Sequence, residues 1–221
     1  YTTIETLTLI LKYKTIRFNR LDRVDDMEEA SLGYGQLYSK LGSYQFVSCW
    51  SKDLEENISL WKMYSNFKGV RISLDEDMFV SYQVNGNFKS YFSDPFKVEN
   101  DCFITYVNNG IKLYDVTYVP DLEAKLKTLA KHSKTEDGNV QLSYKDEDIG
   151  IYKRAHWVFQ KESRFKIVVQ PYDENTSSKT SFDQLFDTIG SIGTSILSNK
   201  PITKEYFDIP LNEKALDTMK I

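Results

Sequence analysis

The chain has 221 residues, of which 41% are apolar, and this length and composition fit a single domain, residues 1–221, with its own hydrophobic core. The formal net charge is −4, which argues against a dedicated DNA or RNA binder with a basic face but leaves open a local basic groove. Two cysteines, Cys49 and Cys102, are too few for a secreted disulfide scaffold, and no apolar run reaches the roughly 18 residues of a membrane span. No signal peptide is evident, so we expect a cytoplasmic protein with free thiols and no membrane partner.

The first half of the chain predicts two helices and several strands. In chain order we expect a helix at 2–14, a strand at 15–19, a loop or short helix at 25–39, a strand at 44–50, a polar loop at 51–57, a helix at 58–67 and a strand at 70–74. Thr3 is the expected N-cap of the first helix, whose apolar residues recur on one face. Gly69 is expected to end the second helix.

The second half predicts more strands and a helical elaboration. We expect strands at 103–107 and 116–119, helices at 121–132 and 146–159, a strand at 164–170 that Pro171 ends, and a last strand at 206–211. Residues 174–181 are polar, and the apolar positions after them keep helical spacing. We expect residues 174–200 to form a helical elaboration that packs against the domain or a partner chain, since its polar face lacks the basic residues of a membrane-surface helix.

These elements follow no regular βαβ rhythm, and no Gly-rich phosphate loop is present, so the sequence supports neither a Rossmann nor a P-loop fold. No internal repeat is visible. The sequence therefore predicts an α+β fold with a strand-rich central core, mostly an antiparallel or mixed sheet, and flanking helices.

Three blocks of the sequence carry a family resemblance. The first contains Tyr1-Thr2-Thr3, Ile16-Arg17-Phe18 and Asp25-Asp26-Met27-Glu28-Glu29; the second contains Val47-Ser48-Cys49-Trp50-Ser51, Leu60-Trp61-x-x-Tyr64 and Lys68-Gly69-Val70; the third is Lys153-x-x-x-Trp157-x-x-Gln160-x-Glu162-x-Arg164. Together they resemble the bacterial family called domain of unknown function 2971. Asp25 and Met27 stand where that family has Asn and Pro, and Gln160 replaces the first Glu of its third block, so no role that needs two carboxylates there is expected.

The opening of the chain also resembles, more distantly, certain ADP-ribosyltransferases. That resemblance implies an ADP-ribosyltransferase-like fold with NAD as cofactor or substrate. It further implies a polar first-strand residue at the nicotinamide ribose, a stacking aromatic residue and a late-strand Glu. The chain begins at Tyr1 without Met, so we expect the polar residue to lie upstream, and Tyr1 and Thr2 to line the ligand site.

Glu162 is the central candidate of the third block. A carboxylate stabilises the cation-like sugar that forms when nicotinamide leaves, and it can activate an acceptor. Arg164 lies two residues further, so on a strand both side chains share a face, and Arg164 can pair with Glu162 or bind a diphosphate. A structural ion pair on a strand is the alternative interpretation.

Five further candidates have equally ordinary alternatives. Trp61 and Tyr64 share a helical face and suit a stacking wall, although aromatic residues at this spacing commonly pack in a core. Ser51 suits a ribose contact or a loop cap. Lys153 lies one helical turn before Trp157 if the segment is helical, so the pair is a candidate phosphate contact or a solvated surface.

The acidic segment supplies the last candidates. Asp26 and Glu29 are candidates for binding a cation or orienting substrate, with a solvated acidic loop as the alternative. No Cys/His cluster predicts a metal site, and Cys49 lacks a matching His for nucleophilic catalysis.

These residues predict an NAD-using transferase or glycohydrolase that acts on a nucleotide ligand and a macromolecular acceptor, in the setting of a toxin or a phage-defence effector. The alternatives are a non-enzymatic sensor that binds a nucleotide or peptide, and a nucleic-acid-processing protein. The transferase hypothesis requires Glu162 to face an open, ligand-sized hollow. A carboxylate closed in an ion pair or directed into bulk solvent argues against it.

Overall fold

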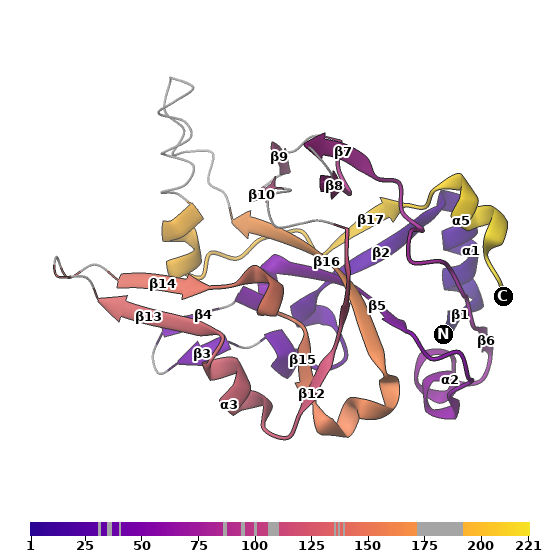
Figure 1. Cartoon of the computed structure of the whole chain (residues 1–221), viewed down its shortest axis with the longest axis horizontal. Helices are drawn as coiled ribbons and strands as arrows, with labels where there is room; N and C mark the ends of the chain where they lie inside the picture. Colours follow the sequence, from indigo (N-terminus) through magenta and orange to yellow (C-terminus); the bar gives the residue numbers. More distant parts are fainter. Residues whose placement is uncertain are drawn as a thin grey trace.

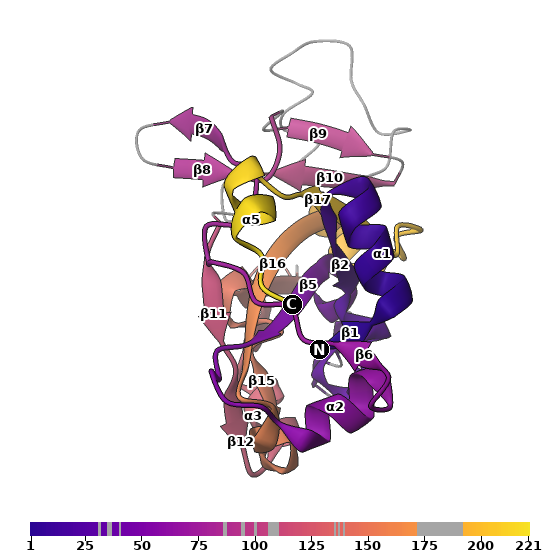
Figure 2. The same cartoon turned by 90° about the vertical axis from the view of Figure 1, so that its right-hand side faces the viewer.

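The computed structural model describes residues 1–30, 32–34, 37–39, 41–85, 88–93, 96–99, 101–105, 111–134, 136, 138, 140–171 and 192–221. The labelled α-helices are α1 (Ile4–Tyr13), α2 (Ile58–Ser65), α3 (Leu122–Lys127) and α5 (Glu213–Thr218). Short 3-10 helices are η1 (Leu21–Arg23), η2 (Met27–Ala30), η3 (Leu41–Tyr44), η4 (Asp146–Asp148) and η5 (Ala155–Gln160). Figures 1 and 2 place α1, α2 and α5 together beside both chain termini.

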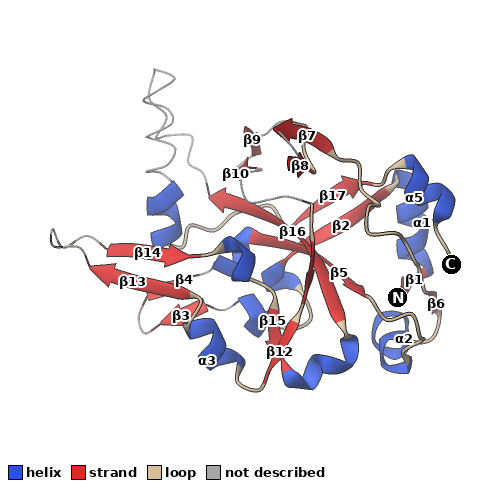
Figure 3. Cartoon of the chain, viewed as in Figure 1, coloured by secondary structure: helices blue, strands red, loops and turns tan. Residues whose placement is uncertain are grey.

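A seven-stranded sheet forms the centre of the molecule (Figure 3). Its order is β17-β2-β5-β16-β10-β9, with β11 also paired to β16; these strands are β17 (Tyr206–Pro210), β2 (Thr15–Arg20), β5 (Gln45–Ser51), β16 (Glu162–Pro171), β10 (Cys102–Thr105), β9 (Phe96–Glu99) and β11 (Leu113–Asp115). Every pairing in this sheet is antiparallel. The predicted α+β class with a mostly antiparallel core is confirmed.

Smaller two-stranded pairs surround the central sheet. They are β1 (Thr2–Thr3) with β6 (Gly69–Val70), β12 (Thr117–Val119) with β15 (Tyr152–Arg154), β13 (Ala130–Lys134) with β14 (Val140–Tyr144), β3 (Leu32–Tyr34) with β4 (Leu37–Ser39), and β7 (Tyr82–Asn85) with β8 (Phe88–Ser90). The β12–β15 pair is parallel.

The hydrophobic core lies mainly on one face of the central sheet. Phe18, Phe46, Phe165 and Ile167 are fully buried there, and Phe79 packs edge-on against Phe165. Helix α1 contributes no buried residue. The cleft described below is lined by side chains from both faces of β2, β5 and β16, including Ile16 and Phe165 of the core face and Asn19 and Cys49 of the opposite face.

Strong periodic patterns located most of the central strands. The expected strands at 15–19, 44–50, 164–170 and 206–211 correspond to β2, β5, β16 and β17 within one or two residues at most ends. The N-cap prediction for α1 is also confirmed, because the Thr3 hydroxyl accepts a hydrogen bond of 3.1 Å from the backbone N–H of Thr6.

The helix predicted at 146–159 is wrong. The segment forms η4, β15 and η5 instead. Gly150 has a φ of +77°, and the Lys166 ammonium and the Arg164 guanidinium hydrogen-bond backbone carbonyls between positions 146 and 150. Carbonyls that accept hydrogen bonds from buried side chains of β16 do not accept the backbone hydrogen bonds of a regular helix. Tertiary contacts therefore outweigh the helical spacing of the apolar residues in this segment.

Two helix ends also differ from expectation. Helix α3 ends at Lys127, because the chain from Ala130 pairs with β14 instead of continuing the helix. Helix α2 ends at left-handed Asn66 and Phe67, so Gly69 is not its stop signal. Position 69 requires glycine for another reason, because a Cβ there would lie 2.0 Å from the carbonyl oxygen of Thr2 in the β1–β6 pair.

The predicted elaboration at 174–200 falls largely outside the described residues, and within them residues 192–197 are helical. The strand predicted at 70–74 is reduced to β6 and an isolated bridge at Ser73. Each helix in the described ranges is too short or too polar to cross a membrane.

Candidate functional site

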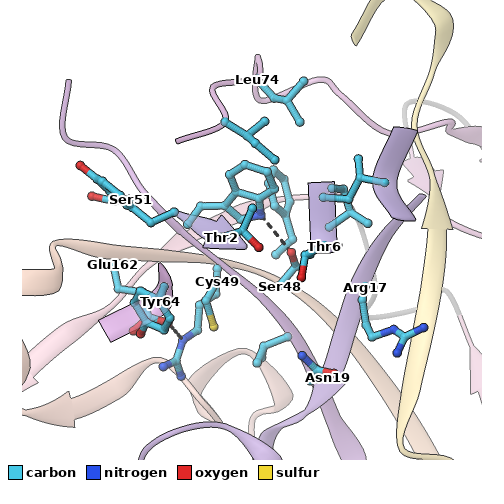
Figure 4. Close-up of a pocket in the computed structure, with 18 of the residues that line it drawn as sticks. Thr2, Thr6, Arg17, Asn19, Ser48, Cys49, Ser51, Tyr64, Leu74 and Glu162 are labelled. Atoms are coloured by element: carbon cyan, nitrogen blue, oxygen red, sulfur yellow. Dashed lines mark hydrogen bonds and ion pairs between the residues drawn. The ribbon is translucent and has the colours of Figure 1, made fainter. Parts of the chain in front are cut away.

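A cleft of about 1040 Å³ is lined by residues of β2, β5 and β16 and by residues of α1, α2 and the segment 71–78. Its volume is at the upper end of the range typical of small-molecule sites. One end is polar and contains Glu162, Cys49 and Tyr64 (Figure 4). The β5–β16 register creates this end, because Glu162 pairs with Ser51 and Arg164 with Cys49, which puts all four side chains on one face.

Four buried charged residues form a cluster behind the polar end, which we call the charged cluster: Glu29, Lys153, Glu162 and Arg164. Arg164 donates from Nε to Glu162 Oε1 at 2.5 Å and from Nη1 to Glu29 Oε2. Lys153 Nζ lies 3.0 Å from Glu162 Oε2 and 3.2 Å from Glu29 Oε1. Each carboxylate therefore contacts both cations, and the cluster has a net charge of zero.

Hydrogen bonding in the charged cluster is incomplete. The Lys153–Glu29 contact is an ion pair without hydrogen-bond geometry, and Glu29 Oε1 accepts no hydrogen bond in the described part of the chain. Arg164 Nη2 is likewise buried without an acceptor there. A buried cluster of this kind fixes side-chain positions more reliably than it adds stability, because removing four charges from water is costly.

Glu162 is ionised throughout the physiological range. Burial on its own would raise its pKa, but the charge and hydrogen bond of Arg164, the charge of Lys153 and a hydrogen bond from the Cys49 thiol lower the pKa from 4.5 to about 2. Both carboxylate oxygens already have a cationic partner. Glu162 lines the cleft, yet it is only 7% exposed and closed in ion pairs, which is the arrangement that argues against a free catalytic acid.

Cys49 presents its side chain to the cleft beside Glu162. The enclosing cleft walls, and then the negative charge of Glu162, raise the pKa of the thiol far above its usual value of 9.0. The exposed surface of the Cys49 side chain faces the confined cleft and not bulk solvent. The thiol is therefore neutral and a poor nucleophile.

Tyr64 lies on α2 and brings an aromatic ring to the polar end of the cleft. Its hydroxyl accepts a hydrogen bond of 2.9 Å from Gln160 Nε2. Burial, followed by the charge and a hydrogen bond of Asp25, raises the pKa of Tyr64, so the phenol stays protonated. The ring is held from α2 and η5 and is available for a contact with a ligand.

Several other predicted site residues also line the cleft. They are Ser51, Tyr1, Thr2, Lys153 and Arg164. The Ser51 hydroxyl caps its own loop by accepting from the Asp53 backbone N–H at 3.3 Å, which is the alternative role considered for it.

Four predicted site residues are not among those that line the cleft: Trp61, Trp157, Asp26 and Glu29. Trp61 packs edge-on against Tyr1 at a centroid distance of 5.1 Å, and Trp157 lies 5.0 Å from the Lys153 ammonium. Asp26 pairs with Arg154 at 3.4 Å. Asp26 and Glu29 thus hold the acidic segment against cations of the domain.

Sequence reasoning missed Asn19 and Arg71 as cleft residues. Arg71 hydrogen-bonds the carbonyls of Asp53 and Leu54 at 3.2 and 2.7 Å and so holds the loop at the cleft edge. Asn19 could have been found from the alternation of buried and exposed side chains along β2. Ile16 and Phe18 are buried on one face, so Asn19 lies on the opposite face. Within the described ranges, no three His, Cys, Asp or Glu side chains are grouped as metal ligands would be.

Comparisons with known proteins identify no relative, since no protein-family model, curated protein or solved structure matches this chain.

Proposed function

We propose that the chain binds a nucleotide in this cleft, with an ADP-ribose-containing ligand such as NAD as the first candidate. The observation that carries the proposal is a single cleft of about 1040 Å³ that joins a polar, charged end to an aromatic ring and an apolar middle. A nucleotide needs these features together, because its sugar and phosphates are polar and its base is flat and largely apolar.

The charged cluster supports binding without turnover. Stabilising an oxocarbenium-like sugar requires uncompensated negative charge next to it. Glu162 contributes a carboxylate whose charge is balanced by Arg164 and Lys153 at 2.5 and 3.0 Å. The same fixed carboxylate suits a ground-state role, in which it accepts a hydrogen bond from a ribose hydroxyl beside the Tyr64 ring.

Binding of NAD, measured by calorimetry on the full chain, is expected to weaken by roughly tenfold in Tyr64→Ala, since a contact between the Tyr64 ring and the nicotinamide base contributes about 1–3 kcal/mol. Tyr82→Ala is the matched control, because Tyr82 is 37% exposed and Tyr64 is 36% exposed, but Tyr82 lies outside the cleft. Equal affinities of the two variants would remove Tyr64 from the site. No binding of ADP-ribose, NAD or AMP to the unmodified chain would refute the proposal.

The second candidate is the NAD-using transferase or glycohydrolase that the sequence resemblance implies. The favouring observation is that Glu162 and Tyr64 line the same end of the cleft. In this hypothesis the ligand displaces one cation from Glu162, and Glu162 then stabilises the sugar cation. A toxin or phage-defence role with a macromolecular acceptor belongs to this candidate alone.

Nicotinamide release from NAD tests the second candidate. If the chain turns NAD over, Glu162→Gln is expected to reduce release by at least about a hundredfold. Glu29→Gln is the matched control, because Glu29 belongs to the same charged cluster but does not line the cleft. Loss in both variants indicates a structural effect, loss in Glu162→Gln alone supports catalysis, and undiminished release in Glu162→Gln removes Glu162 from the mechanism.

A further inference from the structure

Asn19 is a polar residue at the end of the cleft that β2 and α1 form, and its side chain is unpaired within the described residues. It lies on β2 with its side chain exposed, and it lines the cleft together with Arg17 (Figure 4). No side-chain hydrogen bond of Asn19 occurs in the described part of the chain, although most polar side chains near it are paired. An amide of this kind offers one donor group and one acceptor side by side.

The surroundings of Asn19 do not suit an anion. Arg17 is the nearest cation on the same face of the strand, and both its Nε and Nη2 donate to the carboxylate of Asp208 at 2.9 Å. The Arg17 guanidinium also lies 3.6 Å from the centroid of the Tyr206 ring. Because Arg17 and Asp208 compensate each other, this end offers little net charge to a phosphate.

The adjoining wall of the cleft is apolar and uncovered. Helix α1 presents Leu9, Ile10 and Tyr13 to the cleft, and Leu9 and Tyr13 are 51% and 59% exposed. Trp50 and Leu74 also line the cleft but pack against the core cluster that contains Phe18, on the side of the sheet opposite Asn19, so the wall next to Asn19 is formed by α1. An apolar wall beside a free amide matches a flat heterocycle, whose faces are apolar and whose edge hydrogen-bonds.

We propose that this end of the cleft binds the adenine base of the ligand, with the Asn19 amide hydrogen-bonding the N6 amino group and the N7 nitrogen, and with α1 covering one face of the base. An Asn amide fits that edge because adenine presents a donor at N6 beside an acceptor at N7. Guanine presents two acceptors, O6 and N7, along the corresponding edge and leaves the amide carbonyl unpaired. The inference rests on the proposed function and specifies which nucleotide the cleft takes.

Calorimetry with ADP-ribose and with its 7-deaza analogue tests the role of Asn19 on the full chain. The 7-deaza analogue lacks the N7 acceptor, so we expect at least fivefold weaker binding to the unmodified chain. Asn19→Asp keeps the shape of the side chain but replaces its donor with a second acceptor. We expect this variant to bind ADP-ribose at least tenfold more weakly and to lose the difference between the two ligands, as a double-mutant cycle requires.

Ribose 5-phosphate, which has no base, separates this inference from the function on which it rests. Its affinity is expected to be the same for the unmodified chain and Asn19→Asp, and a parallel loss would overturn the assignment of Asn19 to the base. If neither the Asn19→Asp change nor the 7-deaza change alters the binding affinity, the inference is overturned, but the proposed function still stands. If no nucleotide binds, both fail together.

Discussion

Replacing Arg164 with Met is expected to reduce the free energy of unfolding by about 3–5 kcal/mol. Arg164 is fully buried and contacts both Glu162 and Glu29, so its loss leaves two buried carboxylates with Lys153 as their remaining cation. An uncompensated buried charge costs far more than a lost surface pair, because no water replaces the missing partner. Urea denaturation at neutral pH measures the change.

Arg17→Met is the control for this experiment. Arg17 also pairs with a carboxylate, Asp208 at 2.9 Å, but the two side chains are 49% and 37% exposed. We expect a loss of no more than about 1 kcal/mol, as is usual for surface ion pairs. Similar losses in both variants would show that the charged cluster is open to water in solution.

Acid is expected to remove the contribution of Glu162 to stability. Its pKa is lowered from 4.5 to about 2 in the folded chain, so this contribution is fully present above pH 4.5 and disappears as the pH falls towards 2. A shift of this size corresponds to about 3 kcal/mol. The direction follows from linkage, because the unfolded chain binds the proton more tightly than the folded chain does.

Unfolding free energies of the unmodified chain and of Glu162→Gln, measured between pH 7 and pH 2.5, test this expectation. The gap between the two proteins should be widest near neutral pH and should narrow steadily below pH 4.5. A gap that stays constant over the whole range would mean that Glu162 titrates normally in the folded chain, and the ion pairs with Arg164 and Lys153 would then be absent in solution.

The sequence predicted the parts of the fold whose signal is local. The strands β2, β5, β16 and β17 and the N-cap Thr3 follow from alternation, helical spacing and capping chemistry. The helix prediction at 146–159 is wrong, because the structure of this segment depends on hydrogen bonds to its carbonyls from Arg164 and Lys166 of the following strand, β16. No periodicity within that segment encodes those contacts.

The candidate site was predictable only in part for a related reason. The two-residue spacing of Glu162 and Arg164 on a strand correctly places both on one face. It does not reveal that Lys153 of β15 and Glu29 enclose them, because these are tertiary contacts, and Glu29 comes from a segment far away in the chain. Similarly, Trp61 and Tyr64 share a helix, but only Tyr64 lines the cleft, since Trp61 packs against Tyr1.

A crystal structure of the full chain in complex with ADP-ribose tests the central claim most directly. We predict that the ligand fills the cleft, with a ribose next to Glu162 and Tyr64 and the adenine next to Asn19, while the ion pairs of the charged cluster stay closed. A ligand bound elsewhere on the surface, with the cleft left empty or filled by the chain's own side chains, would contradict the account.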